Sequence, residues 1–142
     1  MFRPLISGLA FAALLGAGAS AEVFEVKMLN KNDEGRMVFE PAFVQVAPGD
    51  TVKFIVGDKG HNAEVIAEMI PEGAEAFAGK INEEIEVTLD VEGLYAIKCK
   101  PHFAMGMVMT IAVGEAETPA GYLEGRLPKK ALERFQAQLG NL

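Results

Sequence analysis

The 142-residue sequence has few of the side chains that carry metal and redox chemistry: one cysteine, Cys99, and two histidines, His61 and His102. A single cysteine excludes a disulfide within the chain. The sequence also has no internal repeat, no low-complexity tract and no glycine-rich loop of the phosphate-binding kind. Any chemistry that uses thiolate or imidazole must therefore use these three residues.

Positive charge is also scarce. The chain has 13 lysines and arginines against 20 aspartates and glutamates, which gives a net charge of −7. An acidic protein repels the phosphate backbone of nucleic acids. The composition therefore argues against a nucleic-acid partner.

Long hydrophobic runs are absent except at the N-terminus. Arg3 is followed by the uncharged run 5–19, and the Ala-Ser-Ala of residues 19–21 is typical of a signal-peptide cleavage site. About 15 apolar residues are too few to span a membrane comfortably. We predict a secretory signal peptide over residues 1–21, cleaved after Ala21. Loss of its one charge leaves a net charge of −8 on a single domain, residues 22–142, with no membrane anchor.

Short strand patterns fill most of that domain. They cover residues 23–29, 37–39, 43–46, 51–56, 84–89, 94–97 and 107–113. A short strand followed by one helical turn is expected over 64–70, and Pro48-Gly49-Asp50 predicts a tight turn. Many short strands separated by glycine and proline turns are typical of a β-sandwich.

The pattern becomes helical after Val113. Residues 119–123 suit a short helix, and residues 128–139 suit a longer one with a proline in its first turn and Gly140 beyond its end. Helical spacing predicts that one face of the longer helix packs on the sandwich. That face would carry Leu132, Phe135, Gln136 and Leu139.

The candidate site is the stretch 97–109, Ile-Lys-Cys-Lys-Pro-His-Phe-Ala-Met-Gly-Met-Val-Met, which holds Cys99, His102 and three of the seven methionines. His61 would join them from far upstream. Singly, such residues are usually core or surface side chains. Together, two histidines, a cysteine and a weak axial methionine are the ligands of a blue-copper electron-transfer site. The sequence therefore predicts one copper ion that cycles between Cu(I) and Cu(II).

The axial ligand could be either Met105 or Met107. Met107 begins a strand pattern in which Met107, Met109 and Ile111 share one face by the two-residue period of a strand. A side chain at the buried end of that strand is well placed for an axial ligand. The pattern therefore favours Met107.

Four protein ligands leave no open coordination position, whereas catalytic metal sites keep one free. We therefore predict an electron carrier and not an enzyme. The main alternative is a copper carrier or storage protein that uses the same ligands with labile exchange. A structural zinc site is a weaker alternative, because zinc rarely recruits methionine.

Several segments resemble the pseudoazurins, small blue-copper proteins of the cupredoxin superfamily, and the resemblance covers nearly all of residues 22–142. The similar segments are 28–31, 37–41, 48–52, 58–62, 69–74 and 101–107. The resemblance implies an all-β fold, an eight-stranded Greek-key β-sandwich (cupredoxin-like) with two C-terminal α-helices at about 119–140.

The resemblance implies a copper ligand set. The ligands would be His61, Cys99, His102 and Met107. It also implies that Asn62 ties the two ligand loops together, with its amide region hydrogen-bonded to the cysteine sulfur. Lys100 departs from the family, which usually has threonine there, and we expect this extra charge to cause a modest shift in potential or docking.

The resemblance further implies a periplasmic, monomeric carrier that docks transiently on copper-containing nitrite reductase or c-type cytochromes, in the setting of denitrification. Electrons would pass through His102, inside an apolar collar. The collar residues are Pro101, Phe103, Ala104 and Met105. The lysines expected around the collar are Lys31, Lys59, Lys80, Lys98 and Lys100. For Lys31 and Lys98, a purely solubilising role is the favoured explanation.

Overall fold

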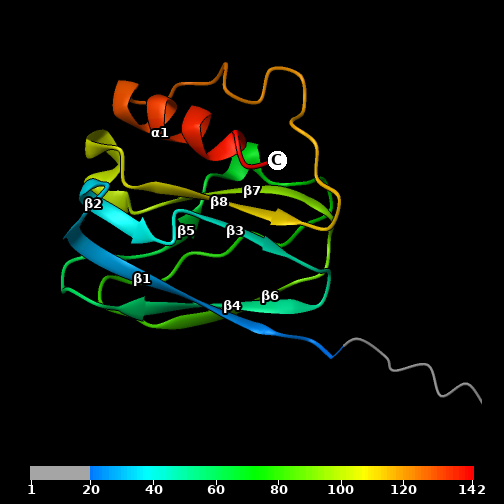
Figure 1. Ribbon diagram of the computed structural model, residues 1–142, viewed down its shortest axis with the longest axis horizontal. Helices are drawn as coiled ribbons and strands as arrows, with labels where there is room; N and C mark the ends of the chain where they lie inside the picture. Colours follow the sequence, from blue (N-terminus) through cyan, green and yellow to red (C-terminus); the bar gives the residue numbers. More distant parts are fainter. Residues whose placement is uncertain (1–19) are drawn as a thin grey trace, which may run out of the picture.

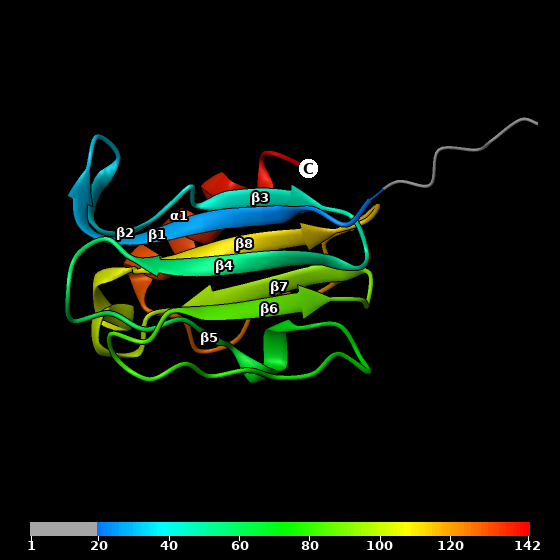
Figure 2. The same cartoon turned by 90° about the horizontal axis from the view of Figure 1, so that it is seen from below.

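The computed structural model describes residues 20–142, in which eight strands form two stacked four-stranded sheets (Figures 1 and 2). The strands are β1 (Val23–Asn32), β2 (Gly35–Glu40), β3 (Phe43–Val46), β4 (Asp50–Val56), β5 (Glu64–Val65), β6 (Ile85–Leu89), β7 (Gly93–Lys98) and β8 (Val108–Val113). The helical elements are the 3₁₀ turns η1 (Ala67–Met69) and η2 (Lys100–Met105) and the α-helix α1 (Lys129–Leu139). The predicted signal peptide lies outside the described residues except for its last two. Among residues 20–142, no helix has the length and apolarity needed to cross a membrane.

The predicted all-β, two-sheet architecture is confirmed. One sheet has the order β2-β1-β4-β6 and the other β3-β8-β7-β5, with β1·β4 and β3·β8 parallel and the remaining pairs antiparallel. Alternate residues of β1 and β4 face the core, so Val26, Val52 and Phe54 are fully buried. The turn predicted before β4 is also present, and Gly49 adopts φ +92°, where glycine has no steric penalty.

Strand β8 is buried on both faces. Met109 and Ile111 point into the core between the sheets, whereas Val108 belongs to a second apolar cluster beneath α1. Figure 1 shows α1 lying across the outer side of the sheet that contains β7 and β8. The helix therefore covers the sheet that carries the candidate ligand stretch.

The predicted helix at 119–123 is wrong. This segment forms hydrogen-bonded turns, with Tyr122 N–H donating to the Pro119 carbonyl at 3.1 Å and Gly121 at φ +73°. A left-handed residue interrupts helical propagation. The Tyr122 hydroxyl donates to the Met69 carbonyl at 3.2 Å and ties this segment to η1. The chain therefore has one C-terminal α-helix among the described residues.

The predicted buried face of α1 is partly wrong. Ala131, Phe135 and Gln138 are buried, whereas Gln136 is exposed. Gln138 is on the inner face because its amide is satisfied there. Its Oε1 accepts the Thr110 hydroxyl at 2.8 Å and its Nε2 donates to the Val108 carbonyl at 3.0 Å.

Replacing Thr110 by valine is expected to lower the free energy of unfolding by about 1–3 kcal/mol, because it leaves the buried Gln138 oxygen without a donor. Urea denaturation of the metal-free protein measures the loss. The matched control is Thr88→Val, which removes an exposed hydroxyl bonded to Thr51 at 2.8 Å and should cost less than about 0.5 kcal/mol. Equal losses of stability in the two variants would contradict a stabilising role for the buried bond between Thr110 and Gln138.

Candidate metal centre

The candidate ligands meet at the end of the sandwich where β7 ends and β8 begins. Cys99 directly follows β7, and Met107 directly precedes β8. Cys99 N–H donates to the Met107 carbonyl at 3.0 Å, and Met107 N–H donates to the His102 carbonyl at 3.1 Å. Gly106, at φ +83°, allows the chain to reverse between the two strands. The ligand loop, residues 99–107, is therefore closed by its own backbone.

Three donor atoms converge at this end of the molecule. His61 Nδ1 and His102 Nδ1 are 3.1 Å apart, and Cys99 Sγ lies 3.7 Å from the first and 3.5 Å from the second. The point equidistant from the three atoms lies about 2 Å from each, which is the bond length of an imidazole nitrogen to a metal such as zinc. The donor set fits a small transition-metal ion.

His61 is oriented for metal binding. Its ring is fully buried, and its Nε2 lies 2.8 Å from Asn30 Oδ1. The amide oxygen can only accept, so Nε2 carries the proton and Nδ1 keeps its lone pair. Burial lowers the pKa of His61, the nearby His102 lowers it further, and Asp58 opposes the shift. His61 is therefore held neutral, as a ligand must be.

The Cys99 thiol is fully buried, and burial raises its pKa. The backbone N–H groups of Asn62 and His102 oppose that rise in pKa, whereas the Glu64 carboxylate adds to it. A metal ligand must be a thiolate, so binding of a cation must displace the proton. The two N–H groups then stabilise the remaining negative charge.

Asn62 joins the two ligand segments. Its Oδ1 accepts the Lys100 N–H at 2.7 Å, and its Nδ2 donates to the Gly79 carbonyl at 3.0 Å and to Glu64 Oε1 at 3.0 Å. The side chain is 4% exposed. The loop that carries His61 is therefore fastened to the loop that carries Cys99.

The two axial candidates lie in different environments. Met107 is fully buried in the main core cluster, next to the ligand segment, whereas Met105 is 42% exposed. Met107 shares that core cluster with Cys99, whereas Met105 does not belong to it. Burial therefore favours Met107 over Met105.

The predicted collar lies on the surface beside His102, which is half-buried. Pro101, Ala104 and Met105 are exposed, and Phe103 is half-buried with Lys98 Nζ 4.9 Å above its ring. This cation–π contact gives Lys98 a structural role. Ile81 is a further exposed apolar side chain, at 56% exposure, that the sequence analysis did not single out.

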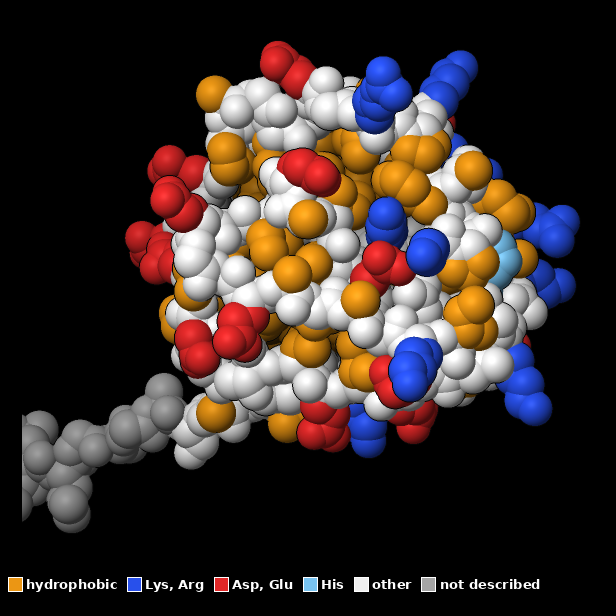
Figure 3. Space-filling view, turned by 180° about the vertical axis from the view of Figure 1, so that it is seen from behind, with side chains coloured by type: hydrophobic (Ala, Val, Ile, Leu, Met, Phe, Trp, Pro, Cys, Tyr) orange, Lys and Arg blue, Asp and Glu red, His pale blue; other side chains and the backbone are white. Residues whose placement is uncertain are grey.

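Charge is unevenly distributed over the surface. In Figure 3 a histidine is visible at one end, among hydrophobic side chains and several lysines or arginines, whereas acidic side chains gather toward the opposite end. The predicted lysines are exposed except Lys98. These exposed lysines are Lys31, Lys59, Lys80 and Lys100. The acidic residues next to the far ends of β6, β7 and β8 are Asp90, Glu92, Glu115 and Glu117.

Sequence analysis also missed three residues that support the site: Asn30, Glu64 and Arg134. Asn30 holds His61, Glu64 accepts from Asn62, and Arg134 donates to the Gly106 carbonyl at 2.7 Å. Each acts through a hydrogen bond to a ligand segment. No periodicity or motif in the sequence marks such a bond.

Comparisons with known proteins agree with this geometry. A family model described as copper binding proteins, plastocyanin/azurin family, matches residues 26–114. The chain is 47% identical to a pseudoazurin of Paracoccus pantotrophus, covering 100% of this chain and 99% of that protein. It is 41% identical to a pseudoazurin of Methylorubrum extorquens, covering 98% of each. A solved pseudoazurin structure from Sinorhizobium, 43% identical, superimposes with a TM-score of 0.80 over 84% of this chain and 95% of that chain.

Proposed function

This chain belongs to the pseudoazurins, within the plastocyanin/azurin family of copper-binding proteins, and we propose that it carries single electrons on one copper ion held by four side chains. The proposed ligands are His61, Cys99, His102 and Met107. When bound, copper supplies the Cu(I)/Cu(II) couple, and the set combines sulfur donors that bind Cu(I) as well as Cu(II) with imidazole, which suits both states. The observation that carries the proposal is the convergence of the two Nδ1 atoms on Cys99 Sγ at 3.7 and 3.5 Å.

We expect the residues around these ligands to hold the donor atoms in place in both oxidation states. Asn30 fixes the ring of His61, and Asn62 fixes the start of the ligand loop through Lys100 N–H. Both tie a ligand segment to a different part of the sandwich. A rigid donor set moves little when an electron arrives or leaves, which keeps the cost of transfer low.

The test is the visible spectrum and voltammetry of the purified copper protein. A Cu(II)–thiolate bond of this kind should give intense visible absorption, and the centre should cycle reversibly by one electron. A colourless copper complex would favour a copper carrier or storage protein. The absence of any redox response would favour a structural zinc site. The complete burial of His61 and Cys99 argues against the labile exchange that a carrier needs.

Replacing Met107 by leucine is expected to raise the reduction potential by more than about 60 mV, a tenfold change in the relative stability of the two oxidation states. Loss of a donor sulfur disfavours the more highly charged ion, whereas the thiolate colour should remain because Cys99 is unchanged. Protein-film voltammetry measures the shift. Met105→Leu is the matched control and should leave the potential unchanged. A shift in the control alone would assign the axial position to Met105.

We further propose that redox partners dock at the end where His102 reaches the surface. The apolar contacts would come from Pro101, Phe103 and Met105. The basic residues Lys59, Lys80 and Lys100 would steer an acidic partner toward it. The charge distribution in Figure 3 supports this orientation. Transient redox contacts are small, typically below about 1,200 Å² of buried surface.

The proposed partners are copper-containing nitrite reductase and c-type cytochromes, in the periplasm of a denitrifying cell. The signal peptide expected over residues 1–21 supports export, and a lone buried cysteine suits an oxidising compartment when a metal occupies it. The small apolar patch supports a monomer that binds each partner briefly.

A further inference from the structure

Arg134 connects three parts of the molecule. Its Nη1 donates to the Met37 carbonyl at 2.6 Å and to the Gly106 carbonyl at 2.7 Å, and its Nη2 donates to the Arg36 carbonyl at 2.7 Å. These acceptors lie in β2 and in the ligand loop, whereas Arg134 lies in α1. Within residues 20–142 no carboxylate is within ion-pair distance of the guanidinium. The side chain therefore directs its donors to backbone carbonyls and not to an acidic partner.

Gly106 occupies a critical point of the ligand loop, next to Met107 and four residues after His102. A Cβ at this position would lie 2.8 Å from the Lys130 side chain and 3.0 Å from the Lys130 backbone. Helix α1 is therefore in direct contact with the loop, and only glycine fits between them. At this contact the Gly106 carbonyl accepts from Arg134, which fixes the direction of the peptide that leads into Met107.

The acceptors in β2 lie where its pairing with β1 is interrupted. Leu29 pairs with Val38 and Lys31 with Arg36, but the pair between them, Asn30 and Met37, is missing from the register. Met37 adopts φ +52°, which is unfavourable for a residue with a side chain, and its carbonyl accepts from Arg134. On the opposite strand Asn30 binds His61. The same interruption therefore anchors both ligand segments, one directly and one through Arg134.

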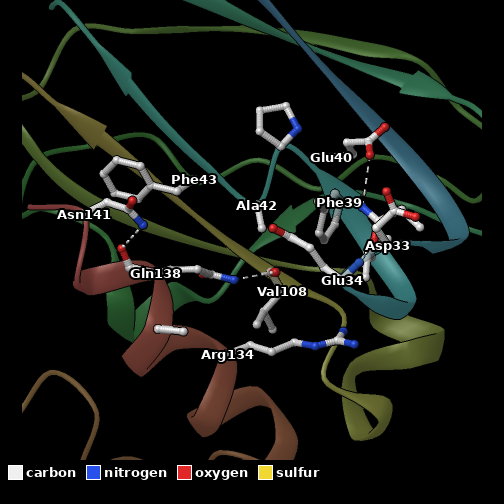
Figure 4. A pocket seen from close by; sticks show the side chains of 14 residues that line it. Asp33, Glu34, Phe39, Glu40, Ala42, Phe43, Val108, Arg134, Gln138 and Asn141 are labelled. Carbon is white, nitrogen blue, oxygen red and sulfur yellow. Dashed lines mark hydrogen bonds between the residues drawn. The ribbon is translucent and has the colours of Figure 1, made fainter.

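Figure 4 shows the groove that Arg134 lines. A groove of about 660 Å³ lies between β2 and α1, and Arg134 lines it together with Glu34, Phe39 and Gln138. Gln138 reaches the Val108 carbonyl from the same helix. Because the groove is open, packing does not hold β2 against the helix here. The guanidinium provides the connection.

We propose that Arg134 is a positioning residue for the metal centre, which holds the Gly106 peptide and so fixes where Met107 stands relative to the His61 segment. The inference rests on the proposed copper site for its functional meaning. Its structural part, that Arg134 holds the Gly106 peptide in place, applies to the metal-free protein as well. The two parts can therefore be tested separately.

The first test measures backbone amide exchange in the metal-free protein by NMR, for Arg134→Gln and for Arg134→Met, which keeps the aliphatic stem. We expect the Met107 N–H, which is bonded to the His102 carbonyl at 3.1 Å, to exchange at least about tenfold faster in both variants. The amide of Val52 in β4, far from the loop, should be unchanged. Two variants keep the test decisive if one of them fails to fold.

Two controls separate positioning from general destabilisation. Arg126→Gln removes an exposed arginine that lies before α1, and it should change nothing. Phe135→Leu weakens the packing of α1 within the second apolar cluster, against which Phe103 of the ligand loop also packs, but it leaves the bond from Arg134 to the Gly106 carbonyl in place. Its effects should spread over α1 and β8. Selective acceleration at Met107 only in the Arg134 variants would support the proposal.

The second test measures the copper-loaded protein. We expect Arg134→Gln to alter the relative intensities of the visible bands and to speed copper loss to a chelator by about tenfold, the scale found when partners of metal ligands are removed. If Arg134→Gln loses stability as Phe135→Leu does, but keeps wild-type exchange at Met107 and a wild-type spectrum, the proposal is overturned. If the wild-type protein itself shows no blue copper centre, the proposed function fails while the exchange data still decide the role of Arg134.

Discussion

Replacing Cys99 by serine is expected to abolish the visible colour of the copper protein and to weaken copper binding by more than about a hundredfold. Loss of residues that merely support a metal ligand costs 10–100-fold, and loss of the only thiolate must cost more. The serine hydroxyl keeps its proton at neutral pH, so it replaces a strong charged donor with a weak neutral one. Absorption spectroscopy and chelator competition measure the two effects.

The same substitution should leave the metal-free fold nearly unchanged, because serine is close to cysteine in volume. Cys99 N–H would still donate to the Met107 carbonyl, so the ligand loop can still close. Thermal unfolding without metal separates a lost ligand from a lost fold. A Cys99→Ser protein that stayed blue and cycled reversibly would refute the proposed ligand set.

Local sequence patterns predicted the strands and the stretch that carries the site. Two-residue alternation depends only on the pleat of a strand, so β1, β4 and β6 could be located without knowing their neighbours. Cys99 and His102 are separated by two residues, and a short loop must keep them close together. His61 was predicted as the distant ligand because the chain has no third histidine.

The supports of the site could not be predicted because they depend on contacts between distant segments. Arg134 reaches the Met37 carbonyl across 97 positions, and Asn30 reaches His61 across 31. An arginine on a predicted helix is usually a solvent-exposed charge, so nothing in its own surroundings marks it as a link. Gln138 shows the same limit, since a polar residue is buried only when the fold supplies partners for it.

The single α-helix after β8 has a related cause. Residues 119–123 have acceptable helical composition, but glycine permits the left-handed conformation that ends helical propagation. The hydrogen bond from the Tyr122 hydroxyl to the Met69 carbonyl then holds this segment against η1 as a series of turns. Local propensity is a weak guide when one tertiary contact fixes the path of a short segment.

Replacing Lys59 and Lys80 together by alanine is expected to lower the rate of electron transfer to copper-containing nitrite reductase by about tenfold or more at low salt. Electrostatic steering raises association rates by about 10–10³-fold, and removal of exposed charges acts mainly on the rate of encounter. The difference from wild type should shrink as salt is added, because exposed charges are screened beyond about 10 Å at 0.1 M. Stopped-flow kinetics over a range of salt concentrations measures both effects. The reduction potential should not change, since neither lysine contacts a ligand.

The matched control removes two positive charges from the outer face of the other sheet. Lys27 is exposed on β1, and Lys53 lies on β4 with its Nζ 3.9 Å from Glu86. Lys27→Ala with Lys53→Ala gives the same net charge as the first pair but leaves the end around His102 intact. If the basic end around His102 is the docking surface, electron transfer should be slow in the Lys59/Lys80 variant and close to wild type in the Lys27/Lys53 variant. Equal slowing in both pairs would mean that overall charge, and not its position beside His102, controls the encounter.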